Sequence, residues 1–397
     1  MINKSRLFTA SCFALITTAM AFAIRAGILT ELGDKFQLNN VELGWVNSMA
    51  FLGFPVATIV GGLLYNLFGP KKLMWAAFIC HVAGILLTIF AGGFWTLLVS
   101  TFFIGFANGT VEAACNPMIS DIYHENKITK LNKFHVWFPG GIVIGSLIAF
   151  LMREADMGWQ LQLATMLVPT AIYAYLIFGQ EFPKSENINT STTTNISNLL
   201  TPLYLFMIFC MTLTATTELG TQQWVEKLLG NAGAHPLLVL AMVTGIMAVG
   251  RYFAGPVIHK LNPTGVLWGS AILATIGIGL MSIATGPMVY VAAIVFAVGV
   301  CYFWPTMIGF TAENVPKTGP LGMSLMGGAG MFATSMWHPV IGGWLDTEKA
   351  AALAGGKTME EAELIAGQAT LDNLAVFPAI LIVAFGVLYF YMKRRAV

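Results

Sequence analysis

The segment Trp95–Ile119, WTLLVSTFFIGFANGTVEAACNPMI, is an almost unbroken apolar run that contains one ionisable residue, Glu112. A helix needs about 20 mainly apolar residues to cross the roughly 30 Å hydrocarbon layer of a bilayer, and this run is long enough. The whole chain has the same character, because 57% of its 397 residues are hydrophobic and only 10% are charged. Soluble domains carry about 25% charged residues. The sequence therefore predicts an all-α polytopic membrane protein.

Apolar segments of this length recur along the chain, and we predict twelve transmembrane helices. They cover residues 8–30, 43–66, 73–92, 95–120, 134–152, 160–180, 201–225, 236–258, 264–285, 288–311, 321–345 and 372–392. The one long external segment, Asp346–Asp372, combines acidic residues with short apolar turns and predicts one or two amphipathic helices on the outer surface.

The distribution of Lys and Arg between loops predicts the orientation, since cytoplasmic loops gather these residues. With a cytoplasmic N-terminus, five fall outside (Lys35, Arg153, Lys227, Lys349, Lys357) and thirteen inside (Lys4, Arg6, Lys71, Lys72, Lys127, Lys130, Lys133, Lys184, Lys260, Lys317, Lys393, Arg394, Arg395). We therefore expect a multi-pass protein of the plasma (inner) membrane with both termini in the cytoplasm. A cleaved signal peptide is the competing interpretation of the first segment, but its loss would leave an odd number of spans.

A polar stretch near the middle of the chain, SENINTSTTTNISN, has no helical periodicity and predicts a linker. We expect an N-terminal six-helix bundle over residues 1–180, a cytoplasmic linker over 181–200 and a C-terminal six-helix bundle over 201–397. Weak internal similarity supports this division, because Asn116–Ile119 can be aligned with Trp304–Met307. The two halves look like repeats.

Two stretches carry a family resemblance. Gly62–Lys72, GLLYNLFGPKK, resembles the loop signature of the major facilitator superfamily, although Asn66 stands where that family usually has Asp. EAACNP from Glu112, followed by LNKFHVWFPGG from Leu131, resembles the fourth and fifth helices of the fucose–proton symporter type of sugar permeases. The resemblance implies two six-helix bundles, a substrate site near the bilayer midplane between the halves, and secondary active transport by alternating access.

The fourth span places Asn108, Glu112 and Asn116 at i, i+4 and i+8, so they share one helix face. A charge at the bilayer centre costs at least about 2.5–3.5 kcal/mol, so this face should meet a water-filled cavity or a partner. Glu112 is either a neutral carboxyl that hydrogen-bonds a neighbouring helix or a proton carrier. Resemblance to the sugar–proton symporters favours the carrier, with Asn108 and Asn116 binding substrate.

The seventh span repeats the pattern with a polar stripe formed by Thr214, Thr217, Glu218, Thr221 and Gln222, and Gln223 is adjacent. The Gln pair offers donors and acceptors that suit hydroxyl-rich ligands, and it resembles the sugar-binding pair of many sugar porters. We expect Glu218 to take part in proton coupling and Thr217, Gln222 and Gln223 to bind substrate. Hydrogen bonding between helices is the alternative, and it is weighed evenly for Gln223.

Arg25 lies about as far into the first span as Glu218 lies into the seventh. The fucose type has an acid in its first span, so this residue departs from the pattern. Its guanidinium is expected either to pair with Glu112 in proton coupling or to clamp a carboxylate, sulfonate or phosphate of the substrate. Arg251 in the eighth span could neutralise Glu218, but it lies toward the cytoplasmic end, where an arginine that snorkels or forms a gate is expected rather than a ligand.

Three further residues are candidate substrate contacts. His135 matches the variable polar position of the fucose-type fifth helix. Trp137 and Trp304 offer aromatic faces on which the CH face of a sugar can stack, although tryptophans also anchor helices at the membrane interface. Trp304, directly before Pro305, is the preferred stacking platform.

No Walker A sequence, HExxH, CxxC or nucleophile elbow occurs, and the five cysteines all fall within predicted spans. We therefore expect no enzyme activity, no cofactor, no metal site and no nucleic-acid partner. The leading hypothesis is a monomeric transporter that moves a monosaccharide together with protons. A symporter of a sugar acid or other organic anion, with Arg25 as the anion clamp, is the runner-up. A sensor or a lipid-handling protein on the same scaffold is the third hypothesis.

Overall fold

A computed structural model describes residues 2–123, 127–183, 199–315 and 318–395, and this part of the chain is helical without strands. The predicted linker falls mostly on residues 184–198, which lie outside the described residues. The chain divides into two compact units. Unit 1 comprises Met1–Leu38 and Trp45–Thr190, and unit 2 comprises Asn39–Gly44 and Ser191–Val397.

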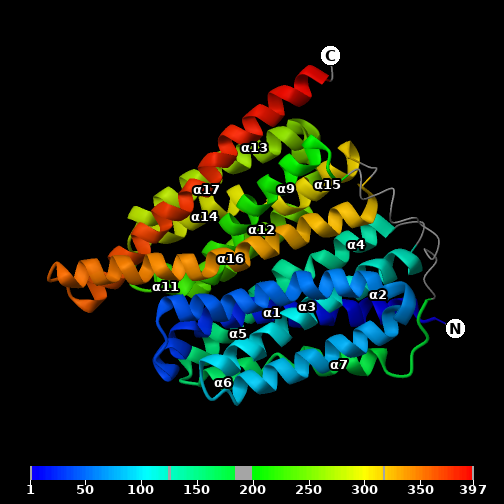
Figure 1. The fold of residues 1–397 in the computed structure, drawn as a ribbon, viewed down its shortest axis with the longest axis horizontal. Coiled ribbons are helices and arrows are strands. Elements are labelled where there is room, and N and C mark those ends of the chain that lie inside the picture. Colours follow the sequence, from blue (N-terminus) through cyan, green and yellow to red (C-terminus); the bar gives the residue numbers. More distant parts are fainter. Residues whose placement is uncertain (1, 124–126, 184–198, 316–317, 396–397) are drawn as a thin grey trace. The chain divides into compact units, whose positions relative to one another are not determined.

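Unit 1 is built from α1 (Lys4–Phe36), most of α2 (Asn40–Ile89), α3 (Phe94–Ile122), α4 (Lys127–His135), α5 (Trp137–Glu154), α6 (Trp159–Ala164) and α7 (Leu167–Ile177). α2 is two membrane segments joined at a kink, because Gly69 has a φ of 73° and Pro70 follows it. The kink separates the predicted spans 43–66 and 73–92. Figure 1 shows α1, in blue, alongside α5, and α1 also packs against α7 and α3.

Close backbone contacts hold α2 and α3 together. A Cβ on Gly105 of α3 would lie 2.0 Å from the carbonyl oxygen of Ala50, and one on Gly109 would lie 2.2 Å from that of Phe54. Small residues at such crossings let membrane helices approach closely. The opposite side of α3 carries Val111 and Cys115 into an apolar cluster with Leu15 of α1. α3 is therefore fixed on both sides, which positions Glu112.

Unit 2 is built from α9 (Pro202–Ala215), the π-helix η1 (Thr216–Gly220), α10 (Thr221–Gln223), α11 (Val225–Leu229), α12 (Pro236–Tyr252), α13 (Ala254–Ile283), α14 (Met288–Val300), α15 (Phe303–Asn314), α16 (Gly319–Ala354) and α17 (Met359–Arg395). α17, drawn in red in Figure 1, packs along α13, and α13 also packs against α14. α13 is kinked at Asn262, whose φ is 54°, directly before Pro263.

The first residues of α2 belong to unit 2, where Asp346 of α16 caps the start of this helix. The carboxylate accepts hydrogen bonds from the backbone N–H groups of Asn40 (3.2 Å) and Val41 (3.1 Å) and from the Asn40 side chain (2.8 Å). A Cβ on Gly342 would lie 2.1 Å from the Asn40 carbonyl oxygen. A carboxylate at a helix N-terminus satisfies free N–H groups and complements the helix dipole.

The predicted external segment is helical on both sides of a short turn. α16 continues to Ala354 and α17 begins at Met359, with Gly356 at a φ of 79° between them. The Ala, Glu and Lys residues of this segment are good helix formers, and a glycine with positive φ ends a helix. The segment therefore extends two long helices, where the sequence predicted separate amphipathic helices.

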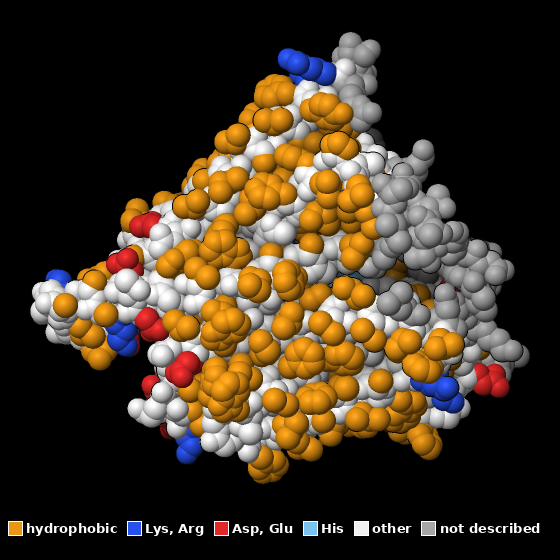
Figure 2. Space-filling view, in the orientation of Figure 1, with side chains coloured by type: hydrophobic (Ala, Val, Ile, Leu, Met, Phe, Trp, Pro, Cys, Tyr) orange, Lys and Arg blue, Asp and Glu red, His pale blue; other side chains and the backbone are white. Residues whose placement is uncertain are grey.

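The helices are long and apolar enough for a multi-pass membrane protein. Among the described residues, ten helical segments satisfy the length and composition of a span, and Pro236–Tyr252 is a shorter apolar helix. α16 covers the predicted span 321–345. Figure 2 shows hydrophobic side chains spread over the visible face of each unit, with Lys, Arg, Asp and Glu mostly near its margins. Extensive exposed apolar surface of this kind marks contact with lipid.

Candidate functional site

A chain of hydrogen bonds joins three predicted site residues of unit 1. Asn116 Nδ2 donates to Glu112 Oε2 at 2.6 Å, and His135 Nε2 lies 3.1 Å from Asn116 Oδ1. Glu112 and Asn116 are half-buried on α3, whereas His135 is the exposed last residue of α4. The Asn116 amide thus connects a carboxyl group in the membrane-spanning part of α3 with an exposed imidazole.

The donor and acceptor roles in this chain follow from the amide. With the amide nitrogen toward the Glu112 carboxylate, the amide oxygen faces His135 and can only accept. His135 Nε2 must then carry its hydrogen and donate a hydrogen bond to Asn116 Oδ1. The Glu112 oxygen accepts this hydrogen bond from the amide, and an amide N–H can donate to either the ionised or the protonated carboxyl.

Asn108 lies two turns before Asn116 but has different partners. Its side chain is fully buried, and its Oδ1 lies 2.9 Å from His81 Nε2. His81, in the second segment of α2, has its Nδ1 3.0 Å from the Tyr173 hydroxyl of α7. The three side chains form a buried network, and the structure places Asn108 in it and outside the Glu112–Asn116–His135 chain.

Arg25 is a buried cation in an aromatic environment. Only 4% of the residue is exposed, and its Nε donates to Asn47 Oδ1 at 3.0 Å. Its guanidinium carbon lies 5.2 Å from the Phe22 ring centre and 5.5 Å from that of Phe51. Aromatic rings attract a desolvated cation. α1 and α2 therefore hold the guanidinium in a fixed orientation.

In unit 2, Glu218 lies in the π-helix η1, where the helical turn is widened by one residue. Glu218 is 5% exposed, and its Oε1 lies 3.3 Å from Nη2 of Arg251. Arg251 Nε also donates to the Cys301 carbonyl at 2.9 Å. The sequence favoured an Arg251 that snorkels or forms a gate over one that neutralises Glu218, and the structure pairs it with Glu218 inside unit 2.

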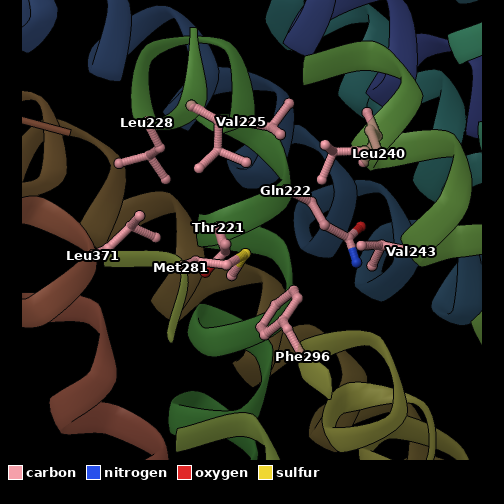
Figure 3. Close-up of a pocket in the computed structure, with 11 residues that line it drawn as sticks. Thr221, Gln222, Val225, Leu228, Leu240, Val243, Met281, Phe296 and Leu371 are labelled. Carbon is pink, nitrogen blue, oxygen red and sulfur yellow. The ribbon is translucent and has the colours of Figure 1, made fainter. Parts of the chain in front are cut away.

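Gln222 lines a small pocket in unit 2, whose walls come from α10, α11, α12, α13, α14 and α17 (Figure 3). Figure 3 shows its carboxamide beside Val243, in a lining that is otherwise apolar apart from Thr221. The space for water-sized molecules is about 20 Å³, which is enough for one or two waters and far below that of a ligand site. A monosaccharide does not fit this pocket in the present conformation.

The other predicted contacts of the seventh span are also buried. The Thr217 hydroxyl donates to the Leu213 carbonyl of its own helix at 2.7 Å. Gln223 is 2% exposed. Glu218 and Gln222 therefore each lie among buried side chains, and the predicted polar stripe of the seventh span is not on an exposed surface of unit 2.

The two predicted tryptophan platforms have different surroundings. Trp137 begins α5 and is largely exposed. Trp304 is partly buried against α16, where a Cβ on Gly327 or Gly330 would lie 3.4 or 3.3 Å from its ring. These glycines let the indole pack closely on α16.

In the part of the chain that the structure describes, the His, Cys, Asp and Glu residues form no group of three or more that could hold a metal ion, and the five cysteines are free thiols.

Comparison with known proteins identifies the family. The family model described as the Major Facilitator Superfamily matches residues 11–348. The chain belongs to the Major Facilitator Superfamily. A solved structure of the nucleoside transporter NupG superposes with a TM-score of 0.76 at 13% identity, covering 98% of this chain and 99% of that one. At this identity the likeness shows the fold of the superfamily.

The curated relatives align with only part of this chain and with only part of their own length. "Myo-inositol transporter 1" of Candida albicans is 26% identical over 38% of this chain and 27% of its own length. The "Galactose-proton symporter" of Escherichia coli is 26% identical over 44% and 39%. The "Sphingosine-1-phosphate transporter SPNS2" of Danio rerio is 26% identical over 39% and 32%. The chain spans about a third of the length of the curated relatives it matches.

The sequence did not single out two residues that hold polar side chains of unit 1 in place. Asn47 orients Arg25, and Tyr173 completes the buried network around His81. A polar residue within an apolar span is a signal for both, but neither stands at helical spacing from a predicted site residue. Their partners lie on other helices, so periodicity within one helix could not find them.

Proposed function

We propose that this protein is a secondary active transporter that moves a monosaccharide or a similarly hydroxyl-rich solute together with protons by alternating access. The observation that carries the proposal is the hydrogen-bonded chain from Glu112 through Asn116 to His135. A membrane-embedded carboxyl group joined to an exposed imidazole suits uptake and release of a proton.

Glu112 is the proposed proton carrier because its charge is costly in the membrane and, among the described residues, the Asn116 amide is the donor that stabilises that charge. Taking up a proton removes the charge and weakens the bond from Asn116. The proposed role of Asn116 and His135 is to stabilise the ionised form when the proton has left. Glu218, which is neutralised by Arg251, is the corresponding group in unit 2.

The proposed substrate class follows from two supports. Curated relatives include proteins named for myo-inositol and for galactose, both hydroxyl-rich. Unit 2 supplies Gln222, Gln223 and Thr217, whose amide and hydroxyl groups match such ligands. Asn108, Trp137 and Trp304 stay as proposed contacts of secondary importance, because Asn108 already bonds His81 and Trp304 packs on α16.

A sugar acid or other organic anion is the second candidate substrate, and the surroundings of Arg25 favour it. The planar guanidinium is held by Asn47 and lies beside two aromatic rings, and a fixed guanidinium binds carboxylates and phosphates well. Arg25 would then clamp the anion, and Glu112 would still carry the proton.

The charge asymmetry of the loops supports placing both termini in the cytoplasm, with the protein in the plasma (inner) membrane. We propose that the monomer is the transporting unit.

A thermal-shift screen of the purified protein tests the substrate class, since a ligand that binds only the folded state raises its apparent stability. We expect stabilisation by at least one neutral hexose or polyol at both pH 6 and pH 8. Stabilisation only by sugar acids or organic anions, lost in Arg25→Ala, would replace the neutral sugar by the anionic alternative. No stabilisation by either class would contradict the proposed function.

A further inference from the structure

A groove in unit 1 lies beside the kink of α2, and both segments of α2 and the middle of α3 line it. Its space for water-sized molecules is about 320 Å³, which reaches the size of ligand-binding pockets. The buried lining residues that form its floor include Ala57, Gly61 and Thr110, and the exposed ones that form its rim are Val60, Phe68 and Lys72.

The floor of the groove suits an alkyl chain and does not suit a sugar. Thr110 is its one polar residue, and the Thr110 hydroxyl already donates to the Phe106 carbonyl at 2.7 Å. A hydroxyl-rich solute would lose its hydrogen bonds to water here without replacing them. An alkyl chain would instead gain free energy, because its apolar surface leaves water or disordered lipid for a matching apolar wall.

The length of the groove matches one leaflet of a bilayer. From Ala57 to Phe68 the first segment of α2 rises about 16 Å, at about 1.5 Å per residue. Half of the hydrocarbon layer is about 15 Å thick. The kink joins two membrane spans and so lies at the membrane surface, which puts Phe68 and Lys72 near the lipid headgroups and Ala57 deeper in the layer.

The headgroup end of the groove is positively charged. Lys72 and its neighbour Lys71 are exposed, and Lys72 Nζ lies 5.5 Å from the ring centre of Phe68. Among the described residues, no carboxylate forms a salt bridge with either lysine. In the orientation proposed above, this end is cytoplasmic, and the cytoplasmic leaflet carries anionic lipids that basic residues attract.

We propose that this groove binds one acyl chain of an anionic phospholipid, whose phosphate pairs with the Lys72 ammonium. The chain packs on the apolar floor, and the charges meet at the membrane surface, where a lysine and a phosphate form a charge-assisted hydrogen bond. The lipid then contacts both segments of α2 and, through Phe106 and Thr110, the helix that carries Glu112. It therefore stabilises the packing of α2 on α3, whichever solute the protein transports.

The test titrates the purified protein in detergent with phosphatidylglycerol or with phosphatidylcholine of the same acyl chains, and native mass spectrometry counts the bound lipids. Lys72→Gln removes the charge at the rim. Its matched control is Lys260→Gln, because Lys260 is an exposed lysine beside the corresponding kink of α13 in unit 2.

Two further variants fill the groove without changing its charge. Ala76→Trp fills it from a half-buried wall, and Val60→Trp fills it from the exposed rim, where the packed interior of unit 1 is left intact. Ile79→Trp is the matched control, because Ile79 is 62% exposed on the same segment of α2 as Ala76 and does not line the groove.

We expect the wild type to bind one phosphatidylglycerol at least about fivefold more tightly than phosphatidylcholine, because each lysine near the membrane surface contributes about a factor of five. Lys72→Gln should lower the affinity for phosphatidylglycerol about fivefold and leave that for phosphatidylcholine unchanged. The two groove-filling variants should lose most of the binding of both lipids. Phosphatidylglycerol should raise the melting temperature of the wild type and of both controls, but not that of the groove-filling variants.

A phosphatidylglycerol with a diazirine at the end of one acyl chain locates the site directly. After irradiation, we expect labelled peptides from the part of α2 around Ala57 and the part of α3 around Thr110. Labelling spread evenly over the apolar surface of both units would overturn the inference. Equal affinity of the wild type for the two lipids, an equal loss of binding in Lys260→Gln, or unchanged binding by both groove-filling variants would also overturn it.

Discussion

Replacing Asn116 by Leu keeps the branching at Cγ and removes both polar atoms that join Glu112 to His135. The structure makes this variant informative, because the bond from Asn116 Nδ2 to Glu112 is 2.6 Å and α3 is fixed by close contacts with α2. The helix should therefore stay in place while the bridge disappears.

The expected effect follows from the strength of the lost bond. A hydrogen bond to a charged group is worth about 1.5–3 kcal/mol. If the ionised form of Glu112 is needed in each transport cycle, this loss slows the cycle by about 10- to 160-fold, since each 1.36 kcal/mol is a factor of ten. The bond between Asn116 and His135 adds little to this figure because the imidazole is exposed and can bond to water.

The assay is uptake driven by a pH gradient in proteoliposomes, measured beside substrate exchange without a gradient. We expect the maximal rate of driven uptake to fall at least tenfold, with exchange reduced less than threefold. Thr110→Val is the matched control on the same helix, because its hydroxyl donates only to the Phe106 carbonyl of α3. Driven uptake within twofold of wild type, or an equal loss in both modes, would refute the proposed role of the amide.

Three further predictions concern the scaffold, and thermal unfolding in detergent measures each. Gly105→Ala should destabilise unit 1 by about 1–3 kcal/mol because the new Cβ meets backbone, whereas Gly62→Ala on α2, where the site is open, should not. Asp346→Ala should cost about 0.5–2 kcal/mol through loss of the cap on α2, and an unchanged melting temperature would exclude a role for the cap. His81→Phe should lower stability by about 1–3 kcal/mol without changing KM, and a variant of normal stability that cannot bind substrate would contradict the structural role.

The membrane spans were predictable because apolar length is a local property of the sequence. The confirmed predictions include the all-α membrane fold and the family. The kinks at Gly69 and Asn262 coincide with a following proline, which local rules also anticipate.

The partners of the polar residues were not predictable in the same way. Helical spacing put Asn108, Glu112 and Asn116 on one face, but Asn108 meets His81 of α2, whereas Asn116 meets His135 of α4. The pairing of Glu218 with Arg251 was one alternative in the sequence, and it was not favoured because Arg251 lies toward the end of its span; the π-helix that holds Glu218 was not predicted. Periodicity gives the face of a side chain, and the neighbouring helices decide what it meets.

The central claim, that Glu112 carries a proton with the substrate, is tested most directly by substrate-dependent proton uptake. Proteoliposomes in weakly buffered medium are given a neutral hexose that stabilises the protein, and the external pH is recorded. The account predicts alkalinisation with the wild-type protein and none with Glu112→Gln, which should still exchange labelled sugar. Uphill accumulation together with alkalinisation by Glu112→Gln would contradict the account and place the proton carrier at another residue.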